Sequence, residues 1–70
     1  MTADPGTVTH PRYRLTELTT YELRDYRKQL ERAVAFFGKQ DPVPAARDRL
    51  QVSLDQVLTE QEARRIARAG

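Results

Sequence analysis

Apolar residues recur at α-helical spacing in two stretches of the sequence, separated by a segment that contains glycine and proline. In the first stretch, six apolar residues fall on one arc of roughly 100°: Leu23, Tyr26, Leu30, Ala33, Val34 and Phe37. In the second, five form a similar stripe: Ala46, Leu50, Leu54, Val57 and Leu58. Beyond Leu58 this stripe turns polar, at Gln61 and Arg65. No alternation typical of a β-strand occurs, so the pattern predicts an all-α fold.

The start of the first helix carries two independent signals. Thr19 and Glu22 have the spacing of a capping box, in which each side chain accepts a hydrogen bond from the other residue's backbone N–H. Leu18 and Leu23 flank this box at the positions of a hydrophobic staple. Because both signals agree on the same start, we predict the first helix over residues 20–37.

Glycine and proline define the break between the helices. Gly38 is expected to end the first helix, because glycine readily adopts the left-handed conformation that often follows a helix. Val43 precedes a proline and is therefore disfavoured in a helix, whereas Pro44 suits the first helical position. The second helix is accordingly predicted over residues 44–68.

Two helices joined by a loop of about six residues are expected to pack as an antiparallel hairpin. This hairpin would occupy residues 16–70. The second helix is the longer one, so its end would overhang the start of the first, and Tyr13, Leu15 and Leu18 are placed to fold back along the overhang. Residues 1–15 show no apolar periodicity, and we interpret them as a flexible N-terminal tail.

Composition argues against most enzymatic and metal sites. The chain has 70 residues, no cysteine and one histidine, so disulfides, thiolate chemistry and the usual Cys or His metal sites are excluded. That histidine, His10, lies in the expected tail, where nothing fixes its geometry for proton transfer. We therefore predict a non-enzymatic protein without catalytic residues, cofactor, metal or small-molecule substrate. No apolar run is long enough for a signal or a membrane span, and we expect a cytoplasmic location.

A chain this short buries a small fraction of its surface, which favours a partner. We expect self-association, most simply as a homodimeric four-helix bundle, or packing against another helical protein. Off-stripe residues that would suit the interface are Phe36, Val52 and Ile66. The residues expected to form core and interface are Leu23, Tyr26, Leu30, Val34, Phe37, Leu50, Leu54 and Val57. The first functional hypothesis is thus a small helical interaction or adaptor module.

A basic pattern supports an alternative hypothesis. Arg24, Lys28 and Arg32 are spaced i, i+4, i+8 and form a possible binding ridge on the first helix, and Arg12–Arg14 adds a short basic arm. Together they suggest an accessory protein that binds nucleic acid.

Acidic neighbours weigh against that alternative. Asp25 and Glu31 have helical spacing to Lys28 and are expected to pair with it. Acidic and basic side chains should also mix at the end of the hairpin where both termini lie, and the formal net charge is only +2. On this interpretation, no large surface patch carries charge of only one sign.

The stretch Leu15–Arg32, LTELTTYELRDYRKQLER, resembles the opening of short uncharacterised helical-hairpin proteins of actinobacteria. In those proteins a similar Leu-Thr-Thr-Tyr-Glu-Leu phrase starts a first helix, and a second helix rich in leucine and arginine follows. The resemblance implies a standalone helical hairpin and brings no catalytic or binding residues with it.

Overall fold

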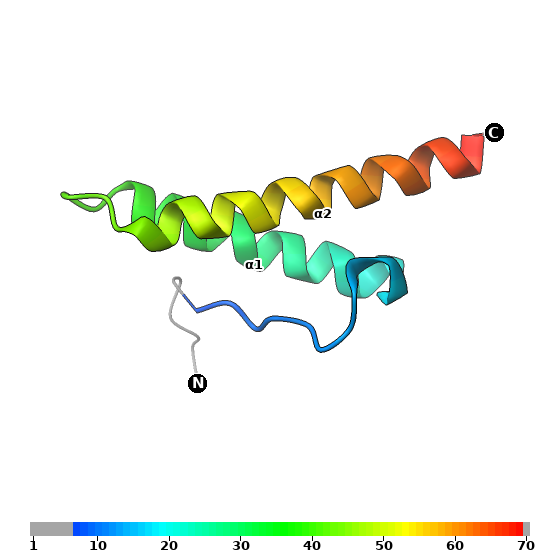
Figure 1. Cartoon of the computed structure of the whole chain (residues 1–70), viewed down its shortest axis with the longest axis horizontal. Helices are drawn as coiled ribbons and strands as arrows, with labels where there is room; N and C mark the ends of the chain where they lie inside the picture. Colours follow the sequence, from blue (N-terminus) through cyan, green and yellow to red (C-terminus); the bar gives the residue numbers. More distant parts are fainter. Residues whose placement is uncertain (1–6, 70) are drawn as a thin grey trace.

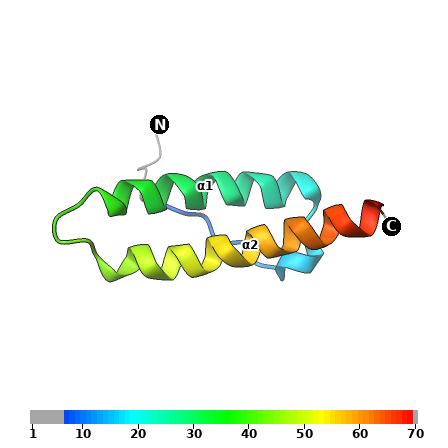
Figure 2. The ribbon, with the colours of Figure 1, turned by 90° about the horizontal axis from the view of Figure 1, so that it is seen from above.

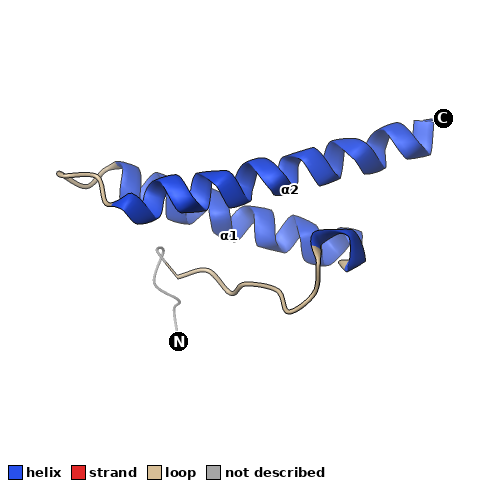
Figure 3. Ribbon diagram, in the orientation of Figure 1, coloured by secondary structure: helices blue, strands red, loops and turns tan. Residues whose placement is uncertain are grey.

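The structure, a computed structural model, describes residues 7–69. It contains a 3₁₀ turn, η1 (Leu15–Glu17), and two α-helices, α1 (Thr20–Gly38) and α2 (Ala45–Ala69). The two helices run antiparallel and side by side, and no strand occurs within the described range (Figures 1 and 3). The predicted all-α hairpin is therefore confirmed. Neither helix is long and apolar enough to cross a membrane.

The start of α1 is built as the sequence predicted. Glu22 N–H donates to Thr19 Oγ1 at 3.0 Å, and Thr19 N–H donates to Glu22 Oε1 at 2.9 Å. This reciprocal pair satisfies two of the backbone donors that the first turn of a helix leaves free. Leu18 and Leu23, on either side of the box, are both buried.

The loop between the helices differs from the prediction. Gly38 is the last residue of α1 and has no positive φ, so the expected left-handed stop at this glycine is wrong. Instead, the N–H groups of Lys39 and Gln40 donate to the carbonyls of Phe36 and Phe37, at 3.4 and 3.1 Å, and tighten the last turn. α2 begins at Ala45, one residue after the predicted start.

The core lies between the two helices and is closed by Leu18, which directly precedes the capping residue of α1. Its largest fully buried side chains are Leu23, Leu30 and Val57, and Leu18, Tyr26, Ala33 and Leu54 are also buried. Val34, Phe37, Leu50 and Ala46 of the predicted stripes are only half-buried. Leu58 stands at the edge, with 38% of its surface exposed.

Residues 7–14 run along the hairpin in an extended path, seen as the blue segment in Figures 1 and 2. Thr9 N–H donates to Gln29 Oε1 at 2.7 Å, and Val8 packs against the core. His10 Nδ1 lies 3.1 Å from the Tyr26 hydroxyl, with the two rings edge to face. The expectation that nothing fixes His10 is therefore wrong.

Leu15 and Leu18 pack against the core, as expected for residues that fold back along the hairpin. Tyr13 does not, because 67% of its surface is exposed. Figure 2 shows that the C-terminal turns of α2 extend past the start of α1, which is the predicted overhang.

Candidate binding surface

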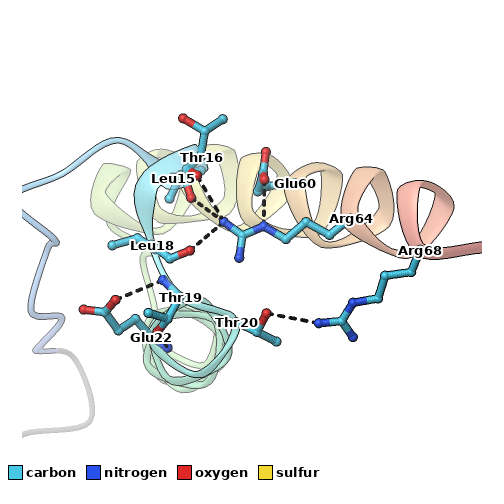
Figure 4. Close-up of polar contacts among 9 residues, drawn as sticks. All are labelled: Leu15, Thr16, Leu18, Thr19, Thr20, Glu22, Glu60, Arg64 and Arg68. Atoms are coloured by element: carbon cyan, nitrogen blue, oxygen red, sulfur yellow. Dashed lines mark hydrogen bonds and ion pairs between the residues drawn. The ribbon is translucent and has the colours of Figure 1, made fainter.

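One arginine near the C-terminal end of α2 bonds the turn that precedes α1 (Figure 4). Arg64 Nη2 donates to the carbonyls of Leu18 at 2.7 Å and Leu15 at 3.0 Å, and it lies 3.5 Å from the carbonyl of Thr16. Arg64 Nε donates to Glu60 Oε2 at 2.8 Å, which confirms the i,i+4 pair expected from their spacing. Arg64 thereby bonds the carbonyl of Leu18, directly before the helix cap, and adds a second donor to the carbonyl of Leu15, which also accepts from Leu18 N–H at 3.2 Å.

Near its C-terminal end, the inward face of α2 carries Arg64, one position before the arginine that the sequence pattern predicted. The sequence placed Arg65 at the polar end of the stripe, but Arg64 points inward and Arg65 is exposed. Arg64 rather than Arg65 faces inward because the backbone carbonyls of the turn before α1 attract the guanidinium of Arg64, which lies nearest to them.

Beside this contact, a groove of about 580 Å³ opens between the first turns of α1 and the last turns of α2. Its apolar lining includes Leu23 and Leu58. We call it the basic groove, because five of its lining residues are arginines and one, Glu62, is acidic. The arginines are Arg24 and Arg27 from α1 and Arg64, Arg65 and Arg68 from α2. As expected from the mixing of charges at this end, Glu60 pairs with Arg64 and Glu62 pairs with Arg65, and an excess of arginine remains in the lining.

Three of these arginines already have polar partners within the protein. Arg64 is held as described above, and Arg27 donates to Glu31 Oε1 at 3.1 Å and to Gln61 Oε1 at 2.9 Å. Arg65 donates to both carboxylate oxygens of Glu62, at 2.6 and 3.0 Å. This hydrogen-bonded pair raises the pKa of Arg65 and lowers the pKa of Glu62.

The other two arginines are available to a ligand, one on each rim of the basic groove. Within residues 7–69, Arg24 makes no side-chain hydrogen bond or ion pair. Over the same range, Arg68 has one polar contact, from Nη2 to Thr20 Oγ1 at 3.5 Å, visible in Figure 4. The groove therefore presents two guanidinium groups that pair with no carboxylate of residues 7–69.

The predicted basic ridge continues from the groove along α1. Arg24, Lys28 and Arg32 are all exposed, and none pairs with a carboxylate of the described residues. The expected neutralisation of Lys28 is wrong: Asp25 accepts a hydrogen bond from Gln29 at 3.0 Å, and Glu31 pairs with Arg27. Arg24 belongs to both the ridge and the basic groove.

The Arg12–Arg14 arm does not line the basic groove. Its residues are exposed, and Arg14 lines a different hollow, together with Leu15, Val52 and Thr59. The structure therefore separates the arm from the basic groove. Sequence reasoning missed the groove because its two rims come from distant parts of the sequence, which only the antiparallel packing of the helices brings together. The signal that could have found it is Arg64, Arg65 and Arg68 in the predicted overhang.

The centre of the apolar stripe is buried within the chain. Leu23, Leu30 and Val57, which were expected to serve both core and interface, expose 1% or less of their surface. Large apolar side chains that remain exposed are Tyr13, Tyr21, Phe36, Val43, Val52, Leu58 and Ile66. Of these, Leu58 is the one that lines the basic groove.

No protein-family model matches this chain, and neither a curated protein nor a solved structure is similar to it.

Proposed function

We propose that this chain is a small non-enzymatic interaction module that binds an anionic partner through the basic groove and the ridge beside it. The observation that carries the proposal is Arg24, which belongs to both surfaces and has no polar partner within residues 7–69. A guanidinium presents a planar fork of donors that matches a carboxylate or a phosphate. A cytoplasmic location belongs to the same proposal and rests on the absence of cysteine.

The energetics of the free chain support this function. Like charges at i,i+4 on one helix repel each other, so Arg24, Lys28 and Arg32 slightly destabilise α1 while they are unpaired. An anionic partner removes that repulsion when it binds. A surface with an excess of positive charge also speeds the encounter with an anionic partner and makes the association sensitive to salt.

The test uses two labelled polyanions, a poly-glutamate peptide and a single-stranded oligonucleotide, and measures binding by fluorescence anisotropy at low and high salt. The variant Arg24→Gln/Lys28→Gln/Arg32→Gln removes the ridge. A control of equal charge, Lys39→Gln/Arg47→Gln/Arg49→Gln, changes the loop end of the hairpin. We expect salt-sensitive binding that the ridge variant weakens much more than the control does. No binding of either polyanion at low salt contradicts the proposal.

Binding to nucleic acid is the particular form of this function that the unpaired ridge also supports. It predicts that the oligonucleotide binds more tightly than the peptide, and that Arg12→Gln/Arg14→Gln weakens oligonucleotide binding. Since the arm lies away from the basic groove, an effect of that variant would require the nucleic acid to reach beyond the groove.

Dimerisation into a four-helix bundle is a separate proposal about assembly. Val52 and Ile66 support it, because they are 57% and 58% exposed and lie 14 residues apart, near one line along α2. The buried stripe cannot serve such an interface without opening the hairpin. Molar mass measured by light scattering over a range of concentrations tests this proposal. A mass of one chain at every concentration contradicts it.

A further inference from the structure

We infer that the basic groove binds an amphipathic helix with acidic flanks, contributed by another protein. The inference rests on the proposed function and names the class of partner for the same surface. It follows from the combination of an apolar lining with two basic rims, which a purely electrostatic site does not need.

The lining of the groove favours a helix over a phosphate backbone. Leu58, which exposes 38% of its surface, lines the groove together with Arg24 and Arg27 from α1 and Arg65 and Arg68 from α2. Phosphate groups gain their affinity from the cations and gain nothing from an exposed leucine. An amphipathic helix gains affinity from the leucine and from the arginines, since its apolar stripe covers Leu58 while carboxylates on its flanks reach the arginines.

The dimensions of the groove suit a short helix. Its rims extend over residues 20–27 of α1 and 58–68 of α2, or about 10 and 15 Å at the rise of an α-helix. That is room for two to three helical turns, by the same estimate. Arg24 and Arg68, which pair with no carboxylate of residues 7–69, lie on opposite rims and can each bind a carboxylate on one flank of such a helix.

Residues 7–14, the described part of the N-terminal segment, do not line this groove. Val8 and His10 line another hollow of the hairpin, together with Leu50 and Ser53, and do not line the basic groove. A second copy of the chain is a poor occupant, because the outward face of α1 carries Arg24, Lys28 and Arg32 and would bring like charges together. Charge complementarity therefore selects an acidic helix from a different protein.

The experiment compares two synthetic helical peptides of 18 residues by titration calorimetry with the full chain. One carries leucines at i, i+3, i+4 and i+7 with glutamates on both flanks. The other keeps every glutamate and replaces each leucine by glutamine. We expect the leucine peptide to bind about tenfold more tightly, because it alone covers Leu58.

Two pairs of variants locate the peptide. Leu58→Ser is expected to abolish the preference for the leucine peptide, whereas Val52→Ser, an exposed apolar residue outside the groove, preserves it. Arg68→Gln should weaken both peptides up to about fivefold, whereas Lys39→Gln, an equal charge change in the loop, leaves them unchanged. Circular dichroism of each variant checks that the hairpin remains folded.

The outcomes separate this inference from the proposed function. Equal binding of both peptides and an oligonucleotide, unchanged by Leu58→Ser, overturns the amphipathic helix and leaves the anion-binding function standing. No binding of any of the three at low salt overturns both. A dimer of the chain that Leu58→Ser dissociates would make a second copy the occupant and overturn the inference.

Discussion

The guanidinium of Arg64 donates a hydrogen bond of 2.7 Å to the carbonyl of Leu18, which lies 46 residues earlier in the chain. Leu18 is the residue directly before the capping threonine of α1. This bond holds the last turns of α2 against the first turn of α1 (Figure 4). It thereby sets Arg65 and Arg68 opposite Arg24, which is the arrangement that the basic groove requires.

Replacing Arg64 should therefore destabilise the hairpin. We expect Arg64→Gln to lower the free energy of unfolding by about 1–2 kcal/mol, because hydrogen bonds from a charged, largely covered group are lost. Arg64→Lys should recover only part of the loss, since one ammonium cannot reproduce the planar fork. Urea denaturation measures the effect. Arg68→Gln, with its single 3.5 Å contact, is the control, and an equal loss there would contradict the assigned role.

The capping box should contribute measurably to the stability of α1. Thr19→Ala removes the acceptor for Glu22 N–H and is expected to cost about 1 kcal/mol. Thr20→Ala, one residue further along and within the helix, leaves the box intact and serves as the matched control. Thermal unfolding followed by circular dichroism compares the two. A lower melting temperature for Thr20→Ala than for Thr19→Ala would refute this reading of the helix start.

The same box should make stability depend on pH in the acid range. Hydrogen bonds from the backbone N–H and the side chain of Thr19 lower the pKa of Glu22 below its ordinary value of 4.5. A carboxylate with a lowered folded-state pKa contributes stability above the unfolded value, and the contribution is lost as pH falls through the folded value. Unfolding in urea between pH 6 and pH 2 should show this decline.

A variant identifies the group responsible for that decline. Glu22→Gln should flatten the pH dependence, whereas Glu17→Gln, an equal charge change outside the box, should keep most of it. Part of the slope will persist in Glu22→Gln, because Arg65 also lowers the pKa of Glu62. An unchanged slope in Glu22→Gln would show that the box does not hold the carboxylate in solution.

The centre of the core should tolerate truncation poorly. Leu30 has no exposed surface, and Leu30→Ala is expected to cost about 3 kcal/mol through lost burial and the cavity left behind. Leu58→Ala, the same change at a partly exposed position, should cost far less. Urea denaturation again gives both values. Similar losses at the two positions would mean that Leu30 is not at the centre of the folded core.

The N-terminal segment should loosen when its contact with α1 is removed. Tyr26→Phe deletes the hydroxyl beside His10 Nδ1 and is expected to cost up to about 1 kcal/mol. Amide hydrogen exchange should become faster at residues 8–10 and stay unchanged at residues 54–57 in α2. Tyr13→Phe, at an exposed tyrosine, is the matched control. Unchanged exchange at residues 8–10 in Tyr26→Phe would contradict the contact.

Local chemistry made much of the fold predictable. Thr19 and Glu22 are three residues apart, so their capping box depends only on the backbone between them, and it was found from the sequence alone. The same holds for the pair Glu60–Arg64 and for the helical spacing of Leu23, Leu30, Leu54 and Val57. The end of α1 was predicted to within one residue, but the left-handed conformation expected of Gly38 was wrong, because tightening of the last turn satisfies its carbonyls instead.

The sequence by itself determined two helices, the N-terminal cap of the first and the faces that must be buried, because these depend on residues within a few positions of one another. Tertiary structure decided which arginine of α2 points inward, which side chain His10 contacts, and whether Lys28 pairs with a carboxylate. It also decided that Arg24 and Arg68, 44 positions apart, form opposite rims of one groove. Each of these outcomes is a competition among partners distant in the chain, and only the packing of α2 against α1 settles which partners lie within reach.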